Sequence, residues 1–552
     1  MTIAKFLLYW RTLRHLSPVQ FYGRVWFRLY RPQLTALLPE YSLRVITGTW
    51  QLPTTRTPLM LKPWQFRFLN YSHTLPAQGG WNDVSLEKLW LYNLHYFDDL
   101  NARESCKRVK WHQALVVRWI RENPPASGNG WDPYPTSLRI VNWIKWLAAG
   151  NTPVSGMLES LVTQASWLDR RKEWHLQGNH LFSNAKTLVF AGLFFEGPQA
   201  AKWLKTGLKI IDNELPKQVL PDGGNFERST MYHAIFLEDV LDLINASTYW
   251  SGHVSETQVL QWREVAGRLL GWLTDMTHPD GEIAFFNDAA FCIAPKVSEL
   301  RAYAQRLRFA NDYPDKESLN LLRFTHFCES GYIRMEADNA VSFLDVAPIG
   351  PDYLPAHAHA DTLSFELSLF SQRVVVNGGT SCYGTGPVRL RERGTSSHST
   401  VQVTGQNSSE VWDGFRVARR AYPLNLQILN QLNKLQVACS HDGYMRLSGE
   451  PMHRREWVMN SGSLMVTDQV MGGEHCAVAR YILHPNVKVI EIGANEWLLE
   501  LPRGEIIKIK VLVGRTKLED AKYAPEFGKV LSTKSITVDL IKGLARTELC
   551  WS

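Results

Sequence analysis

The spacing of apolar residues changes once along this chain, and this change limits the fold more than any other feature of the sequence. Between about residues 85 and 322, apolar residues recur three or four positions apart, as on one face of an α-helix. Segments with this spacing occupy residues 86–100, 107–123, 137–149, 156–170, 183–195, 200–215, 231–247 and 256–276. Gly, Pro and Asn lie between them, which predicts consecutive helical hairpins.

After about residue 324, apolar residues alternate with polar ones or form short β-branched runs. Such runs occupy residues 331–336, 340–346, 362–370, 372–379, 399–405, 435–443, 455–460, 463–470, 487–492 and 506–514. This spacing is typical of antiparallel strands in a β-sandwich. We therefore predict an N-terminal segment 1–84 that packs on the next domain, a helical domain 85–325 and an antiparallel β-sandwich 326–552.

The first 39 residues contain six Lys or Arg and no Asp or Glu, with many apolar residues between them. Such a basic amphipathic segment either lies on a membrane surface or packs its aromatic side chains on the following domain. No run approaches the roughly 18 apolar residues of a membrane-spanning helix, and the start of the chain lacks a small-residue cleavage site. We therefore expect no secretory signal and favour a cytoplasmic or membrane-peripheral protein, with periplasmic export left open.

The composition favours a folded protein with an anionic partner. The net charge is +7, and 21 Trp, 19 Tyr and 23 Phe provide flat faces that fill helical cores or stack on sugar rings. Nucleic acid is the least favoured partner, because the basic residues are spread along the chain and the usual helix, finger and RNA-binding signatures do not occur. An acidic polysaccharide or oligosaccharide is the partner that we expect.

Two polar clusters interrupt the helical part of the sequence. In the first, Asn179 and His180 open an apolar helix, where Asn179 is either a functional residue or an N-cap. In the second, Glu227, Tyr232 and His233 lie at a loop-to-helix junction, where a capping network explains Glu227 equally well. Such interruptions of regular patterning are where functional residues are expected.

Two further clusters lie in the predicted β-sandwich. His357 and His359 share one face of an extended segment, and alternating histidines indicate a metal site or an acid/base site. A Gly-rich stretch, residues 377–403, contains Arg389 and Arg393. Clustered arginines suit the bidentate capture of carboxylates or sulfates, and a mobile basic surface loop is the alternative.

These clusters carry a resemblance to a known family. The order of motifs is GNH at 178–180, ExSxxYH at 227–233, HAHAD at 357–361, NGGT at 377–380 and RGTSSHSTV at 393–401. It resembles the heparinase II/III-like polysaccharide lyases and their alginate-lyase relatives over roughly residues 85 to 420. The resemblance implies an incomplete (α/α) toroid followed by an antiparallel β-sandwich, with an active cleft between them.

The resemblance also implies a reaction, the β-elimination of a uronate-containing polysaccharide. It assigns Asn179 and His180 to the uronate carboxylate, and Tyr232 and His357 to catalytic proton transfer. The C5 proton becomes acidic only when donors take up charge on the carboxylate, and the O4 leaving group needs a proton. We expect Tyr232 to protonate O4 and either His357 or Tyr232 to remove the C5 proton. The expected substrate-binding residues are Glu227, His233, Tyr383, Arg389 and Arg393.

Relatives of this kind often hold a metal, usually zinc, on a His, an Asp and a second His. The matching positions are His359, Asn377 and His398, so the Asp position is Asn in this chain. A carboxamide is a poorer zinc ligand than a carboxylate. A zinc site and a purely hydrogen-bonded cluster are therefore both left open.

Two other functions remain as alternatives. A glycoside hydrolase on a similar toroid would need two carboxylates, which Asp222, Glu227 and Asp288 could supply. The order of the motifs favours elimination over hydrolysis. A non-catalytic protein that binds glycans during polysaccharide biosynthesis is the third possibility.

Overall fold

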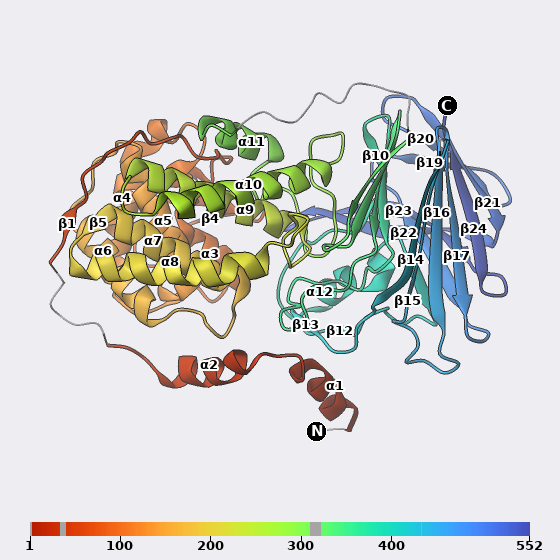
Figure 1. Ribbon diagram of the computed structural model, residues 1–552, viewed down its shortest axis with the longest axis horizontal. Helices are drawn as coiled ribbons and strands as arrows, with labels where there is room; N and C mark the ends of the chain where they lie inside the picture. The colour runs from red at the N-terminus through yellow and green to blue at the C-terminus, as the bar shows by residue number, and fades with distance from the viewer. Residues whose placement is uncertain (1–2, 34–39, 310–321, 432) are drawn as a thin grey trace.

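The chain folds into a helical half and a β-sheet half, in that order (Figure 1). The computed structural model describes residues 3–33, 40–309, 322–431 and 433–552. The last helix of the first half, α11, ends at Arg306, and the first strand of the second half, β6, begins at Arg323. The predicted order of an α domain followed by an antiparallel β domain is confirmed.

The helical half is an incomplete (α/α) toroid with an inner and an outer layer. Its helices are α3 Lys88–Tyr96, α4 Val109–Glu122, α5 Pro133–Ala148, α6 Met157–Arg170, α7 Gly178–Phe194, α8 Pro198–Gln218, α9 Thr230–Tyr249, α10 Glu256–Asp275 and α11 Val297–Arg306. The inner helices α7 and α9 are buried along nearly their whole length, whereas α8 and α10 expose a polar face. This difference follows from their apolar patterns, because a helix that is apolar on all sides is stable only in a core.

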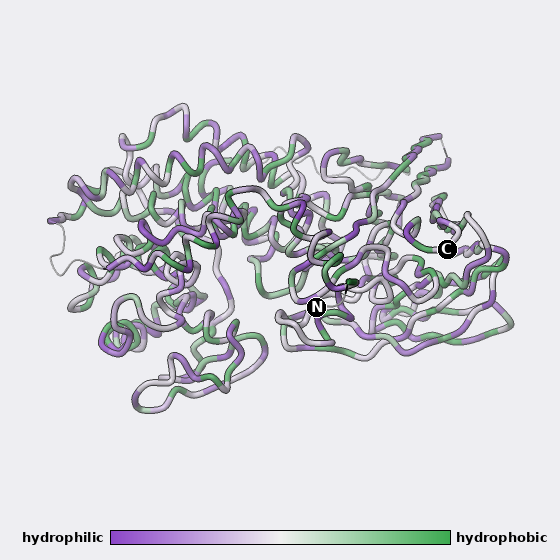
Figure 2. The backbone as a smooth tube through the Cα atoms, turned by 90° about the horizontal axis from the view of Figure 1, so that it is seen from below, coloured by the Kyte–Doolittle hydropathy of each residue, from purple (hydrophilic) through white to green (hydrophobic). Residues whose placement is uncertain are grey.

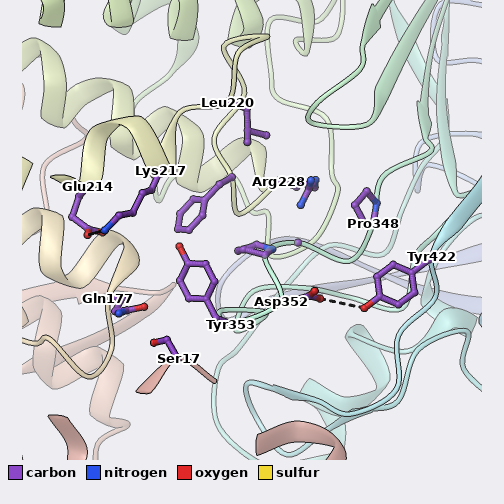
Figure 3. A pocket seen from close by; sticks show the side chains of 13 residues that line it. Ser17, Gln177, Glu214, Lys217, Leu220, Arg228, Pro348, Asp352, Tyr353 and Tyr422 are labelled. Carbon is purple, nitrogen blue, oxygen red and sulfur yellow. Dashed lines mark hydrogen bonds and ion pairs between the residues drawn. The ribbon is translucent and has the colours of Figure 1, made fainter. Parts of the chain in front are cut away.

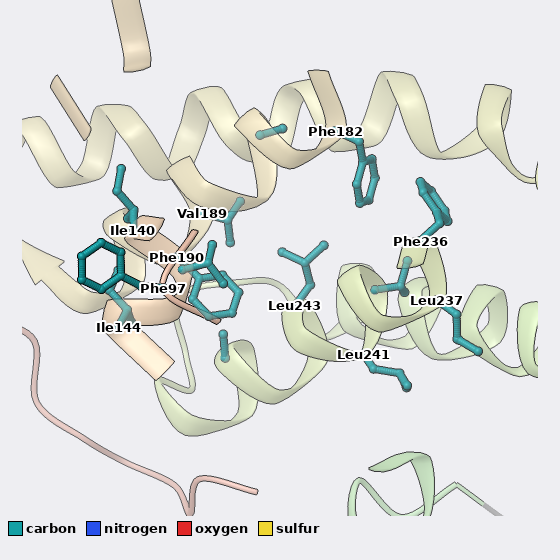
Figure 4. Packing of buried hydrophobic residues seen from close by; sticks show 14 of the residues in the cluster. Phe97, Ile140, Ile144, Phe182, Val189, Phe190, Phe236, Leu237, Leu241 and Leu243 are labelled. Atoms are coloured by element: carbon teal, nitrogen blue, oxygen red, sulfur yellow. The ribbon is translucent and has the colours of Figure 1, made fainter. Parts of the chain in front are cut away.

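The toroid core lies where α5, α7 and α9 meet (Figure 4). Side chains in this region include Phe97, Ile140, Ile144, Phe182, Val189, Phe190, Phe236, Leu237, Leu241 and Leu243. Burying one such large apolar side chain stabilises a fold by about 1.5–3 kcal/mol. The core therefore holds the N-terminal ends of α7 and α9, which carry two of the polar clusters, in fixed positions.

A small antiparallel sheet precedes the toroid helices, and the sequence analysis did not predict it. Its strands are β2 Met60–Lys62, β3 Gln65–Phe68 and β4 Tyr71–Thr74, while β1 Ser42–Leu43 pairs with β5 Phe195–Glu196. Phe66 and Phe68 point from β3 into the toroid core. The Asp99 carboxylate accepts the backbone N–H groups of Leu59 (2.7 Å) and Met60 (3.0 Å), which fastens the sheet to the helices.

The β half contains three main sheets that share one core. The first is β10 Gln372–Val375, β9 Phe365–Leu369, β8 Ala340–Asp345, β7 Tyr332–Ala337 and β6 Arg323–Phe327. The second is β14 Pro423–Gln431, β15 Lys434–His441, β16 Met452–Asn460, β17 Ser463–Met471, β24 Leu544–Cys550, β21 Ile506–Val513, β20 Glu496–Glu500 and β19 Lys488–Gly493. The third is β11 Val401–Val403, β18 Ala477–Ile482, β23 Lys529–Asp539 and β22 Arg515–Glu526, and a separate hairpin pairs β12 Val411–Trp412 with β13 Arg416–Val417. Buried and partly exposed residues alternate along β16 and β17, as expected for strands with one face on a core.

Residues 3–33 form an N-terminal strap outside both domains. The strap contains α1 Ile3–Leu13 and α2 Pro18–Leu29, which lie below the two domains in Figure 1. Figure 1 places α1 near the middle of the long axis, below the region where the two halves meet.

The strap contacts both halves of the molecule. On the sandwich side, the ring of Tyr9 lies 5.0 Å from that of Trp412. On the toroid side, the Arg171 guanidinium donates to the carbonyl of Phe27 (2.7 Å), and the rings of Phe27 and His175 are 4.3 Å apart. These contacts fix which face of each strap helix points toward the protein.

Within the described residues, none of the helices combines the length and the apolar character needed to cross a bilayer. Figure 2 shows hydrophobic stretches that are short and alternate with hydrophilic ones along the chain.

Candidate active site

A buried carboxylate, Asp288, organises the junction between the toroid and the sandwich. It lies in the loop after α10, and this loop inserts into the β half. Its oxygens accept from His357 Nδ1 (2.9 Å) and His359 Nε2 (2.8 Å), and Arg389 binds both oxygens. Burial alone would raise the pKa of Asp288, but Arg389 and the two histidines hold it well below its usual range. Asp288 is therefore a carboxylate at neutral pH.

The contact with Asp288 determines how His357 can act. Because a carboxylate only accepts hydrogen bonds, we assign the proton of neutral His357 to Nδ1, which leaves a lone pair on Nε2. His357 Nε2 lies 3.6 Å from Glu227 Oε2, and the side chain is 11% exposed. His357 thus presents a proton acceptor on the side away from Asp288.

Tyr232 lies beside His357, in the first turn of α9. The Ser229 hydroxyl caps this helix by accepting the Tyr232 backbone N–H (3.2 Å). The two rings are stacked, with centroids 3.8 Å apart, and the Tyr232 hydroxyl hydrogen-bonds the Tyr383 hydroxyl (2.7 Å). Burial, followed by the proximity of Tyr383 and Asp288, raises the pKa of Tyr232 well above its ordinary value. Tyr232 is therefore a protonated phenol that can donate.

Asn179 and His180 lie in the first turn of α7, on the other side of Glu227. The Glu227 carboxyl group contacts the backbone N–H of Asn179; burial raises its pKa, and the neighbouring His357 and His180 oppose this rise. Burial lowers the pKa of His180, but Glu173, whose Oε1 lies 3.2 Å from His180 Nδ1, outweighs this effect and raises it. The start of α7 therefore combines an imidazole whose protonated form is favoured by Glu173 with the positive end of a helix dipole, which suits an anion.

The structure thus brings the four predicted catalytic residues to one place at the domain junction. Glu227 lies between Asn179 and His357, and it is buried with its Oε2 making no hydrogen bond within the described residues. Tyr383, also predicted, reaches the same place through its hydroxyl contact with Tyr232. These positions are the geometry on which the proposed mechanism rests.

His233 does not belong to this group, and its prediction as a substrate-binding residue is wrong. It is fully buried, and its ring stacks on Trp272 at 4.4 Å. Its Nδ1 accepts the backbone N–H of Asn225 (3.1 Å), and its Nε2 donates to the carbonyl of Leu269 (2.8 Å). Both ring nitrogens are therefore used inside the toroid.

The predicted substrate-binding roles of Arg389 and Arg393 are also wrong, because both guanidinium groups are fully buried. Arg389 is paired with Asp288. Arg393 donates to the carbonyls of Ala358 (2.9 Å) and Gly414 (3.1 Å), and burial followed by the charge of Arg389 lowers its pKa to about 9. Both arginines hold the loop in place instead of facing a ligand.

We therefore expect Arg393→Ala to destabilise the fold without weakening substrate binding. Each buried carbonyl left without a donor costs about 1–3 kcal/mol, which should lower the thermal midpoint clearly. Arg391→Ala is the matched control, because Arg391 lies in the short helix α12 Pro387–Glu392, directly before Arg393, and its side chain is 43% exposed, so the midpoint should change little. A raised KM for an acidic polysaccharide in the Arg393 variant, with an unchanged midpoint, would contradict this assignment.

The predicted metal positions form a hydrogen-bonded cluster that does not fit zinc. His359 Nδ1 and His398 Nε2 are 3.2 Å apart, and His359 Nε2 donates to Asp288. The Asn377 carboxamide is fully used, because its oxygen accepts the Ser399 N–H (3.1 Å) and its nitrogen donates to a backbone carbonyl (2.9 Å). Among the residues described, no three His, Cys, Asp or Glu side chains are grouped to hold an ion. The donor set therefore lacks a third ligand.

The sequence analysis missed several residues at the junction. Asp288 appeared there only as a possible hydrolase carboxylate, although it lies in the motif FFNDA at 285–289. The ring of Tyr134 lies 4.5 Å from that of His180, and Phe415 lies 6.2 Å from His357 and 5.2 Å from Tyr383.

A cavity of about 650 Å³ adjoins this site and is lined by both halves and by the strap (Figure 3). Its lining residues are Ser17, Gln177, Glu214, Lys217, Leu220, Phe226, Arg228, Pro348, Gly350, Pro351, Asp352, Tyr353 and Tyr422. Gln177 and Phe226 directly precede Gly178 and Glu227 in the chain, so the cavity lies beside the Tyr232 and His357 pair and does not contain it.

The fold and the site define a class of two-domain proteins, in which an (α/α) toroid and an antiparallel β-sandwich meet at a cluster of Tyr, His and Asn side chains. Two family models match the chain: "Heparinase II/III N-terminus" over residues 110–320 and "Heparinase II/III-like, C-terminal" over residues 320–543. The chain belongs to the heparinase II/III-like family.

Individual relatives are distant. Heparin-sulfate lyase of Pedobacter heparinus is 24% identical over 357 residues, which is 56% of this chain and 53% of that protein. Heparin-sulfate lyase of Bacteroides stercoris is 25% identical over 249 residues, 42% of this chain and 36% of that protein. The chain thus spans about half or less of the length of these curated relatives.

Solved structures share the fold. A crystal structure of heparinase III has a TM-score of 0.70 at 18% identity and covers 96% of this chain and 88% of its own. Heparan sulfate lyase from Pedobacter heparinus has a TM-score of 0.57 at 18% identity, covering 88% of this chain and 81% of its own. At this identity the likeness shows the architecture alone.

Proposed function

We propose that this protein is a polysaccharide lyase that cleaves a uronate-containing acidic polysaccharide by β-elimination. The observation that carries the proposal is the stacked pair of Tyr232 and His357, in which one member is a protonated phenol and the other has a free Nε2. A proton donor and a proton acceptor that lie in contact can act on O4 and on the C5 proton of the same sugar ring.

In this mechanism, His357 is the base and Tyr232 is the acid. The C5–H bond breaks and its proton passes to His357 Nε2, while the electron pair is delocalised onto the carboxylate attached to C5. This electron pair then forms the C4–C5 double bond as the C4–O4 bond breaks, and O4 receives the Tyr232 proton. The raised pKa of Tyr232 supports these two roles. A phenol that keeps its proton before substrate binds cannot act as the base.

The uronate carboxylate is proposed to lie at the start of α7. The Asn179 carboxamide and the His180 imidazolium would donate to it, and both interactions strengthen as negative charge grows on the carboxylate during proton removal. The raised pKa of His180, caused by the neighbouring Glu173, supports a donating role for this ring. The adjoining cavity would take the neighbouring sugar residues.

The substrate class that we propose is a glycosaminoglycan-like polysaccharide. The names of the curated relatives, which are heparin-sulfate lyases, support this class. We further propose that the reaction needs no metal, because the cluster around His359 lacks a third ligand.

The glycoside hydrolase is not favoured. Asp288 is bound by Arg389 and two histidines, so it is not available as an acid or a base toward a sugar. Asp222 accepts the backbone N–H groups of Glu329 (3.0 Å) and Ser330 (2.7 Å), which uses its Oδ2 in holding a loop. Of the three carboxylates, Glu227 alone has an oxygen, Oε2, without a hydrogen bond in the described part of the chain, and a hydrolase of this kind needs two such groups.

The test is incubation of the protein with a panel of acidic polysaccharides. We expect ultraviolet absorbance from the new C4–C5 double bond with at least one uronate-containing polymer, at the same rate with and without a chelator. New reducing ends without this absorbance would indicate a hydrolase. Binding without any product would indicate a glycan-binding protein, and loss of product after chelation would contradict the metal-free mechanism.

A further inference from the structure

The two helices of the strap expose an apolar stripe to solvent. On α2, the stripe consists of Tyr22, Val25, Trp26 and Leu29, which are 59–77% exposed. On α1, it consists of Ile3, Phe6, Leu7 and Trp10, which are 39–81% exposed. In both helices, the spacing is i, i+3, i+4, i+7, so each stripe lies on one face.

Such a stripe normally faces a protein core, but here the other face of the strap is the one that packs on the domains. Gly23 lies against His175, where a Cβ atom would come within 3.1 Å of the His175 Cβ. The Gln20 side chain donates to the carbonyl of Tyr353 (2.9 Å), and the Trp412 indole donates to the Thr12 hydroxyl (3.0 Å). These contacts hold the stripes outward.

The strap is also cationic and contains no acidic residue of its own. Arg11, Arg24, Arg28 and Arg31 make no ion pair within the residues that the structure describes, and the strap contains no Asp or Glu. Arg24 instead lies near Arg28 and the sandwich residue Arg416, and burial followed by these two charges lowers its pKa. Exposed aromatic residues beside unpaired arginines favour a partner that is both apolar and anionic.

We propose that the strap docks the protein on a bilayer that contains anionic lipids, with α1 and α2 lying in the plane of the interface. The apolar stripes would enter the boundary between headgroups and acyl chains, where Trp and Tyr are favoured. The arginine side chains would reach the lipid phosphates. A second copy of the strap is a poorer partner, because two segments of six positive charges and no negative charge repel each other.

Docking through the strap would place the cavity beside the candidate active site near the membrane. The strap residue Ser17 lines the cavity beside the candidate active site, so a bilayer bound to the strap's outer face lies close to the cavity mouth. The inference does not depend on the lyase proposal, because it concerns a surface that contains none of the proposed catalytic residues.

Sedimentation with lipid vesicles tests the proposal. We expect the full-length protein to sediment with vesicles of phosphatidylcholine and phosphatidylglycerol, and much less with phosphatidylcholine alone or at high salt. Leu29→Ser and Trp26→Ser should each weaken binding about tenfold, because an apolar side chain no longer enters the interface. Arg28→Gln should weaken it about fivefold.

Matched exposed residues outside the strap provide the controls. Leu260→Ser on α10 removes a leucine that is 65% exposed, and Lys205→Gln on α8 removes an exposed charge. Neither should change vesicle binding, and no variant should change the thermal midpoint. Absence of binding to anionic vesicles, or equal binding by the strap and control variants, would overturn the proposal. Self-association that Leu29→Ser abolishes, without vesicle binding, would also overturn it and assign the stripes to a contact between copies.

Discussion

Tyr232→Phe should lower the turnover of a uronate polysaccharide by about 10² to 10⁴ while the fold remains intact. The substitution removes one oxygen and keeps the ring that stacks on His357 at 3.8 Å. Only the proton donor for O4 and the hydrogen bond to Tyr383 are lost. The measurement is the rate of ultraviolet absorbance at saturating substrate, together with the thermal midpoint.

A buried tyrosine of the toroid core serves as the control for this result. Tyr249 is 8% exposed and packs against Trp50 and Trp250, away from the junction. Tyr249→Phe should leave the turnover unchanged. If the wild type yields unsaturated products and Tyr232→Phe matches its rate, Tyr232 is not the acid, although the protein would still be a lyase.

The second large effect is expected for Asp288→Asn, which should impair both stability and turnover. Removing one partner of a buried ion pair leaves Arg389 uncompensated, at a cost of about 3–5 kcal/mol. The carboxamide also no longer fixes the proton of His357 on Nδ1. In part of the molecules the proton then lies on Nε2, which cannot accept the C5 proton. We expect kcat to fall by about 10² or more, with KM changed little.

A second buried carboxylate of the same chemistry separates these two effects. Asp468, in the sandwich, accepts from Arg455 (2.7 and 2.9 Å) and from His453 (2.8 Å), and all three are buried. Asp468→Asn should therefore cost similar stability but leave kcat unchanged at a temperature where the variant is folded. Equal losses of kcat in the two variants, or normal kcat in Asp288→Asn, would show that Asp288 does not position His357.

The sequence allowed prediction of the domain order and of most residues at the junction, because these are properties of local pattern and motif. It failed where the outcome depended on tertiary packing. Tyr232 and His233 are consecutive, but successive residues of an α-helix point about 100° apart, so only Tyr232 points toward His357. Arg389 and Arg393 lie in a Gly-rich stretch for which ligand binding was predicted and a surface loop was the alternative, yet both side chains are fully buried.

Asp288 was missed as an organising residue for a related reason. Its partners His357, His359 and Arg389 lie 69 to 101 positions away in the chain. No local spacing connects a loop after one helix with an extended segment and a short helix of another domain. Only the folded structure shows what the Asp288 carboxylate contacts.

The small sheet formed by β2, β3 and β4 determines where the chain can be shortened. The family models match from residue 110, yet Phe66 and Phe68 pack into the toroid core. Asp99, which binds the backbone of Leu59 and Met60, also accepts a hydrogen bond from Arg108 (2.8 Å). A gene shortened to begin at residue 110 would encode helices with an uncovered apolar flank, which favours aggregation. A protein shortened to begin near residue 40 would lose the strap but keep the contacts of Phe66 and Phe68 with the toroid core, and it is the better starting point for crystallisation.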